Sequence, residues 1–321
     1  MNDFQRYLVE EYVEDYQGGH LTRREALRHI AAVTGNLAVA NTLLATCTPP
    51  AQSTATPAAM ATSVPAATST GASSATTAPT ATNASGTVAP DDPAIEAGMV
   101  EFPGEGATLM ASLARPKGDG SSPVVLVCHE NRGLTDHIKD VARRFAKAGY
   151  VALAVDLLSR QGGTAAITDQ AQIPGTLGNT PPEQFVQDFI SGWRYLQSQS
   201  FAAADRVGMV GFCFGGGVTW RVATAMPELR AAVPFYGPHP PVEQVPNIQA
   251  AVLAIYGERD QRINQGIPVI EAAMEANNKI YQKVIYPNAD HAFFNDTGPR
   301  YDPEAARDAW QQTLAWLAKY V

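Results

Sequence analysis

Residues 206–220 read RVGMVGFCFGGGVTW, and this stretch decides the fold that the sequence predicts. The apolar run bounded by glycines is typical of a buried strand, and the Gly-x-Cys-x-Gly at its end is typical of a sharp strand-to-helix turn with Cys213 at the tip. Small residues beside Cys213 allow the strained backbone of such a turn. The following helix would direct free N–H groups at the thiol, which favours the thiolate. Cys213 is therefore a candidate nucleophile, and the alternative is a buried, unreactive cysteine.

Strand and helix signals alternate on both sides of this turn. Apolar runs predict strands at 109–115, 124–128, 151–155, 206–211, 231–236, 250–256 and 280–286, and helical spacing predicts helices at 136–148, 185–197, 214–225, 268–277 and 303–319. The alternation indicates an α/β fold, a mostly parallel sheet with helices on both faces. Ligands of such sheets bind at the carboxyl ends of the strands. The polar segment 159–182 is expected to be a loop over that edge, with a role as a lid left open.

Few polar residues directly follow the predicted strands, and those that do would share one crevice. They are Cys213 after the strand at 206–211, Asp260 after the strand at 250–256, His291 after the strand at 280–286, and the run His129, Glu130, Asn131 and Arg132 after the strand at 124–128. The order Cys213, Asp260, His291 is the chain order of the α/β-hydrolase triad. An isolated Asp is more often a turn residue, and an isolated His on a loop is more often exposed to solvent, but three residues in this order favour an acyl-transfer site.

The segment from about Glu101 to Val321 resembles the dienelactone hydrolase family, α/β-hydrolases that use cysteine at the nucleophile turn. The resemblance lies in four motifs: Gly-Phe-Cys213-Phe-Gly-Gly, Tyr-Gly-Glu-Arg-Asp260, Asp-His291-Ala-Phe and Cys-His-Glu130-Asn-Arg-Gly. It implies that Cys213, His291 and Asp260 hydrolyse carboxylic ester or lactone bonds of a small molecule through an acyl-thioester, with no metal or organic cofactor.

The resemblance also implies roles for residues around the cysteine. Glu130 would contact the resting thiol, and the backbone N–H groups of Asn131 and Phe214 would form the oxyanion hole. The sequence departs from the family at Asn295, where well-known members carry an arginine for the substrate carboxylate. The natural substrate therefore stays open, as does a substitute role for Arg132 or Arg300.

The first 47 residues are typical of an export signal. Arg23 and Arg24 precede a weakly apolar run at 29–45, which is the pattern of a Tat signal. The run is too short and too often interrupted by polar residues for a transmembrane helix. The Leu-Ala-Thr-Cys47 motif resembles a lipobox, in which Cys47 would be lipidated and become the mature N-terminus. We expect an exported protein that meets the membrane only through this anchor; the alternative is an amphipathic helix with a chance Arg-Arg pair.

The composition divides the rest of the chain into a linker and a domain. Residues 48–90 carry no charge and consist mostly of Thr, Ala, Ser and Pro, which predicts a disordered spacer. Residues 91–321 are expected to fold as one domain. This domain has 25 acidic against 19 basic side chains and no basic run, which argues against nucleic acid as a partner. The composition does not indicate an oligomeric state.

Two cysteines fall in the predicted domain, and we expect both to be free thiols. Cys128 ends a strand run and is expected to be a core residue. Thiol redox chemistry is one alternative function, and it would require Cys128 and Cys213 to pair, since the sequence contains no Cys-x-x-Cys. The other alternative is a catalytically silent binding module that has kept the hydrolase fold.

Overall fold

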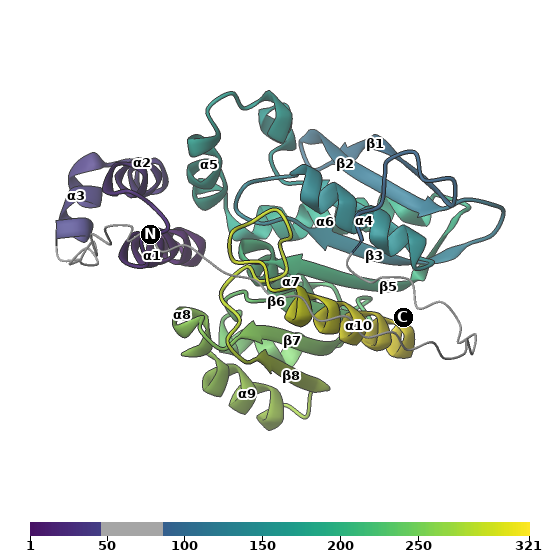
Figure 1. Ribbon diagram of the computed structural model, residues 1–321. Coiled ribbons are helices and arrows are strands. Elements are labelled where there is room, and N and C mark those ends of the chain that lie inside the picture. Colours follow the sequence, from purple (N-terminus) through teal and green to yellow (C-terminus); the bar gives the residue numbers. More distant parts are fainter. Residues whose placement is uncertain (46–85) are drawn as a thin grey trace, which may run out of the picture.

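The structure is a computed structural model that describes residues 1–45 and 86–321 (Figure 1). Cys47 and residues 48–85 of the predicted linker lie outside the described residues. The last linker residues already belong to the folded body, because Val88 is buried and its N–H donates to Asp140 Oδ1 at 2.7 Å. The packed part of the domain therefore begins slightly before the predicted boundary at Asp91.

A single sheet of eight strands forms the centre of the described chain. The strands are Ile95–Gly104 (β1), Ala107–Pro116 (β2), Ser122–Cys128 (β3), Val151–Asp156 (β4), Ala202–Phe212 (β5), Ala231–Phe235 (β6), Ala251–Gly257 (β7) and Tyr281–Tyr286 (β8). Their order is β1-β2-β4-β3-β5-β6-β7-β8. The strand β2 runs antiparallel to β1 and β4, and the other neighbouring strands pair in parallel. The predicted mostly parallel sheet is confirmed.

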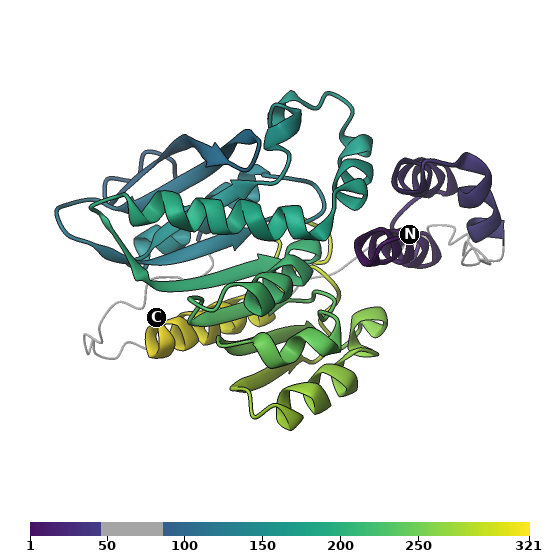
Figure 2. The same ribbon diagram turned by 180° about the vertical axis from the view of Figure 1, so that it is seen from behind.

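Burial on both faces explains why the central strands could be predicted. Every residue of β4, β6 and β7 is buried. Both faces of these strands must be apolar, because helices cover both sides of a parallel sheet. The helices Asp136–Lys147 (α4) and Pro303–Tyr320 (α10) lie on one face, and Pro182–Gln197 (α6) and Phe214–Ala225 (α7) lie on the other (Figures 1 and 2).

The remaining short elements lie in the connections. The predicted loop 159–182 contains three 3₁₀ turns and one helix: Ser159–Gln161 (η1), Thr164–Ala166 (η2), Gln170–Gln172 (η3) and Ile173–Asn179 (α5). Three further elements flank β7: Val242–Asn247 (η4), Gln261–Asn264 (α8) and Ile267–Ala276 (α9). None of the helices in the described ranges is both long and apolar enough to cross a membrane.

The N-terminal residues form three helices: Asp3–Gln17 (α1), Arg23–Thr34 (α2) and Leu37–Ala45 (α3). Capping boxes begin the first two, with Asn2 and Gln5 at α1 and Thr22 and Glu25 at α2. The group, purple in Figure 1, lies beside α5. Asn2 Nδ2 donates to the Gly178 carbonyl at 3.0 Å, and Gln5 Nε2 donates to Asn179 Oδ1 at 2.8 Å. Segments some 170 residues apart in sequence are thus joined by direct hydrogen bonds.

Candidate active site

Cys213 lies at the sharp turn between β5 and α7. It is the N-cap residue of α7 and has φ 58° and ψ −121°. This backbone conformation is energetically unfavourable for any residue other than glycine. The glycines around it are needed for close approach, because a Cβ at Gly211 would collide with the Gly215 carbonyl and one at Gly215 would collide with the His129 carbonyl. The turn thus holds the Cys213 side chain in place at the carboxyl end of the sheet.

Asp260 and His291 meet at the same edge of the sheet. Asp260 follows β7 as the N-cap of α8, and its Oδ1 accepts from Ile263 N at 3.3 Å. His291 Nδ1 lies 2.6 Å from Asp260 Oδ2, in a loop that follows β8. The other ring nitrogen, Nε2, has no hydrogen-bond partner in the described chain. The imidazole lies within 4.8 Å of Cys213 Sγ.

The burial of these groups sets their protonation. Burial lowers the pKa of His291, but the charge of Asp260, together with that of Cys213 whenever the thiol is ionised, outweighs it, so that the pKa lies well above its usual value. Burial raises the pKa of Asp260, yet the neighbouring His291 holds it below the usual range. Burial and the Glu11 carboxylate raise the pKa of Cys213, with His291 acting in the opposite direction. The resting cysteine is therefore held as the thiol.

Two backbone N–H groups near Cys213 are free. In the described chain neither Asn131 N nor Phe214 N donates a hydrogen bond. Phe214 is the first residue of α7, where N–H groups lack helical acceptors. Asn131 lies in the turn after β3, which the Gly215 contact with His129 brings against the start of α7. These are the N–H groups that the sequence suggested for an oxyanion hole.

Glu130 is buried near the thiol but bonds to a different residue. Its Oε2 accepts from Asn295 Nδ2 at 2.6 Å, and Asn295 Oδ1 accepts from Thr297 N at 3.0 Å. The asparagine at the position of the family's arginine thus ties Glu130 to the loop after β8. We expected Glu130 to contact the resting thiol, but in the structure it bonds to Asn295, and a different carboxylate lies beside the sulfur.

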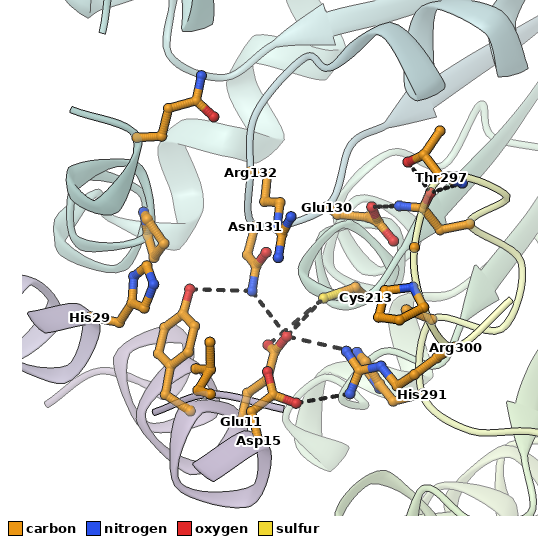
Figure 3. A pocket seen from close by; sticks show the side chains of 18 of the residues that line it. Glu11, Asp15, His29, Glu130, Asn131, Arg132, Cys213, His291, Thr297 and Arg300 are labelled. Atoms are coloured by element: carbon orange, nitrogen blue, oxygen red, sulfur yellow. Dashed lines mark hydrogen bonds and ion pairs between the residues drawn. The ribbon is translucent and has the colours of Figure 1, made fainter. Parts of the chain in front are cut away.

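That carboxylate belongs to Glu11 on α1. Cys213 Sγ lies 3.6 and 3.7 Å from the two Glu11 oxygens (Figure 3). The same sulfur lies 3.2 Å from the Tyr7 hydroxyl. Asn131 Nδ2 donates to Glu11 Oε1 at 2.9 Å, and His291 Nε2 lies 4.0 Å from the same oxygen. One helix of the N-terminal group therefore reaches directly to the candidate nucleophile.

A cavity of about 290 Å³ adjoins the thiol. Its wall includes Cys213 and His291 from the body and Glu11 and Asp15 from α1. Arg132 and Arg300 also line it, so arginines lie near the site although Asn295 replaces the family's arginine. Arg300 Nη1 is engaged by Asp15 Oδ1 at 2.8 Å (Figure 3).

Cys213 Sγ, His291 Nε2 and a Glu11 oxygen lie within 4.8 Å of one another, the one set of three such ligand atoms found in residues 1–45 and 86–321. These residue types can hold Zn²⁺. In this site the Glu11 oxygen already accepts from Asn131 Nδ2.

A family model described as the dienelactone hydrolase family matches residues 109–321. The chain belongs to the dienelactone hydrolase family. Two relatives, both named "Putative carboxymethylenebutenolidase", are from Salmonella typhimurium strain LT2 and Escherichia coli strain K12. The first is 37% identical over 262 residues, covering 76% of this chain and 95% of the relative. The second is 36% identical over 263 residues, covering 76% and 94%.

Solved structures agree with this membership. A crystal structure of a "Putative Dienelactone Hydrolase" from Klebsiella pneumoniae is 34% identical, with a TM-score of 0.66, and the match covers 71% of this chain and 100% of that one. An acylaminoacyl peptidase from Pyrococcus horikoshii is 14% identical with a TM-score of 0.57, over 71% of this chain and 42% of that one, which shows a shared fold alone. The dienelactone hydrolase homologue described here has the α/β-hydrolase fold.

Sequence reasoning missed the residues that α1 adds to the site of this dienelactone hydrolase homologue. Phe4, Tyr7, Leu8, Glu11 and Tyr12 are buried at helical spacing, and Glu11 is the only acid among them. An acid within an apolar helical stripe is a signal that could have been read, since buried carboxylates need partners. The sequence could not indicate which surface the stripe would cover.

The structure also bears on the two cysteines and the thiol redox alternative. Cys128 and Cys213 are both free thiols, as expected, and both side chains are buried. Cys128 pairs with Gly211 across β3 and β5 and packs in the core, and its thiol is directed to the His129 carbonyl at 3.8 Å. The disulfide that redox chemistry would require is absent from the described chain.

Proposed function

We propose that this protein hydrolyses carboxylic ester or lactone bonds of small molecules through Cys213, His291 and Asp260. The observation that carries the proposal is the buried 2.6 Å contact between His291 Nδ1 and Asp260 Oδ2, which leaves Nε2 free beside the thiol. Family membership supports the same chemistry, because the relatives are named as carboxymethylenebutenolidases and dienelactone hydrolases.

The chemistry follows from what each group can do. His291 Nε2 takes the thiol proton as Sγ attacks the carbonyl carbon, and the C=O electron pair moves to oxygen. The N–H groups of Asn131 and Phe214 would stabilise this oxyanion, a contribution of about 3 kcal/mol per donor. The C–O bond then breaks, and the leaving alcohol takes the proton from His291. Water, deprotonated by His291, attacks the thioester, the carboxylic acid leaves, and the thiol is restored.

The test compares two alanine substitutions in the full chain. Cys213→Ala should lower the turnover of p-nitrophenyl acetate by at least about 10³-fold, because the nucleophile of a triad is removed. Cys128→Ala removes the other buried thiol and should keep turnover per folded molecule. Circular dichroism checks that both variants fold. Unchanged turnover in Cys213→Ala would rule out the nucleophile assignment.

We further propose that the protein is exported and anchored through lipidated Cys47. The support is the sequence pattern of Arg23, Arg24 and the motif that ends at Cys47. Arg24 is exposed near the start of α2, where an export receptor could reach it. A signal peptidase that cuts before Cys47 would release residues 1–46, which include the whole of α1, α2 and α3.

A further inference from the structure

We propose that α1 is an internal competitor of the substrate: it docks across the active site as an acidic helix, and hydrolysis requires it to leave. This inference rests on the hydrolase function proposed for the same site. The surface on which α1 docks consists of Cys213, Asn131 and His291 at the centre and of three arginines, Arg221, Arg262 and Arg300, around them.

The first argument is the space around the sulfur. A carbonyl carbon under attack must approach Sγ to about 3–3.5 Å. The Tyr7 hydroxyl lies 3.2 Å from Sγ and the Glu11 oxygens lie at 3.6 and 3.7 Å, and Cys213 is only 3% exposed. Glu11 Oε1 also takes the hydrogen bond from Asn131 Nδ2 at 2.9 Å. An ester carbonyl and these two side chains cannot occupy this space together.

The second argument is the charge complementarity of the docked helix. Asp3 Oδ2 lies 2.7 Å from Arg221 Nη2, Glu14 Oε2 lies 3.1 Å from Arg262 Nε, and Asp15 Oδ1 lies 2.8 Å from Arg300 Nη1. The three arginines belong to α7, to α8 and to the loop before α10. Three pairs from one helix to three separate elements fix its position and register on the body.

Apolar contacts complete the docking. The Phe4 ring lies 4.7 Å from the ring of Phe214, the residue after Cys213, and 5.8 Å from the ring of Phe185. The Arg262 guanidinium lies 4.5 Å from the centre of the Tyr7 ring. These contacts place α1 directly on the side chain of Phe214, the first residue of α7.

The third argument is that docked α1 disfavours the thiolate form of Cys213 and that the helix can still dissociate from the body. The Glu11 carboxylate adds to burial in raising the pKa of Cys213, so the docked helix also opposes the thiolate that attacks a substrate. The side chains of Asp3 and Glu14 are 58% and 41% exposed. Ion pairs of this exposure are weak and screened by salt, so these two contacts of the helix can open.

The experiment compares two reversals of charge on α1 in the full chain. Glu14→Lys places a cation against Arg262, whereas Glu10→Lys makes the same change four residues earlier, at an exposed side chain that forms no ion pair with the described residues. The readouts are the rate at which iodoacetamide alkylates Cys213, followed by mass spectrometry of its peptide, and kcat/KM for p-nitrophenyl acetate.

Glu14→Lys should raise the alkylation rate and kcat/KM together, each by about 3- to 10-fold, because both scale with the fraction of molecules in which α1 has left. Glu10→Lys should leave both at the parent value. Added NaCl should raise both rates in the parent protein, since it screens the exposed ion pairs of Asp3 and Glu14.

Two results would overturn the inference. Equal alkylation rates in Glu14→Lys and the parent would show that α1 does not limit access to Cys213. Faster alkylation with a lower kcat/KM would show that α1 is a working wall of the active site. If Glu14→Lys is alkylated faster but neither the parent nor the variants turn over the ester, the result supports the docking of α1 over the thiol and counts against the proposed hydrolase function. A failure of the docking proposal can therefore be told apart from a failure of the hydrolase proposal.

Discussion

The contact between Asp260 and His291 sets the charge that the proposed chemistry uses. The Asp260 side chain is fully buried, and its charge helps to hold the pKa of His291 above the usual value against the effect of burial. A buried carboxylate also fixes the orientation of the imidazole, with Nδ1 toward Asp260 and Nε2 on the opposite side of the ring. Both effects depend on the negative charge, which an amide of the same shape lacks.

Asp260→Asn should therefore lower kcat/KM by about 10³- to 10⁴-fold. The remaining activity should persist to lower pH, because His291 loses the charge that raises its pKa and stays neutral in more acid solution. The measurement is the pH profile of kcat/KM between about pH 5 and 9. Asp290→Asn is the control, since Asp290 adjoins His291 in sequence but is 42% exposed and pairs with Arg259. An unshifted acid limb in Asp260→Asn would contradict the assigned partner.

At the residue scale, sequence reasoning reached the side chains whose positions depend on local structure. Cys213, Asp260 and His291 each follow a strand, and parallel strands bring their carboxyl ends to one edge. The hydrogen bond of Glu130 to Asn295 and the approach of Glu11 to Cys213 were not predictable, because each joins segments more than 160 residues apart. Such contacts depend on how loops and helices pack, and no local pattern encodes that.

At the scale of elements, burial decides what the sequence reveals. The strands β3 to β7 carry nearly continuous apolar runs and were predicted to within a few residues. The edge strand β1 was missed. It has a single neighbouring strand and most of its residues are exposed, so its sequence shows neither a continuous apolar run nor an alternation of apolar and polar residues. The separate helices of residues 1–45 were not predicted, because Arg23, Arg24 and the weakly apolar run after them were interpreted as an export signal.

The loop after β8, which carries His291 and Asn295, is tied to α4 by Asp296. The Asp296 carboxylate contacts His137 Nδ1 at 2.9 Å and also Arg144 Nη2. Burial alone would raise the pKa of Asp296, but these two partners lower it from 3.8 to about 2. A carboxyl whose pKa is lower in the folded state stabilises the fold above its unfolded pKa, and that stability is lost as the pH falls toward 2.

Asp296→Asn should accordingly lower the free energy of unfolding by about 1–2 kcal/mol at pH 7. The difference from the parent should shrink below about pH 5 and continue to shrink toward pH 3, as the parent carboxylate protonates. Urea denaturation at a series of pH values measures this difference in the free energy of unfolding. Asp119→Asn, at an exposed loop carboxylate, should stay within about 0.5 kcal/mol of the parent throughout. A deficit that does not vary with pH would contradict the assigned contacts.

At the scale of the whole molecule, the proposed export signal and the docked helix belong to the same segment. Arg23 and Arg24 begin α2, and α1 precedes them with Tyr7 and Glu11 on the thiol. A cut before Cys47 would remove both together. The proposed signal would then also keep the hydrolase closed until the chain has been exported, and the mature form would have an open site.

Replacing Arg23 and Arg24 by lysines tests this link in a Tat-competent bacterial host. The double variant should accumulate a precursor that begins at Met1, since a Tat signal requires its arginines. The parent should yield a mature form that begins at lipidated Cys47. Per molecule, the mature form should hydrolyse p-nitrophenyl acetate about tenfold faster than the precursor or more, because only one-tenth of the precursor molecules are active if α1 is docked in nine-tenths of them.

Arg28→Lys is the control, since it makes the same change elsewhere on α2, and this variant should be processed like the parent. A parent protein that still begins at Met1 would contradict export, whereas a mature form no faster than its precursor would contradict the docking of α1 as a competitor.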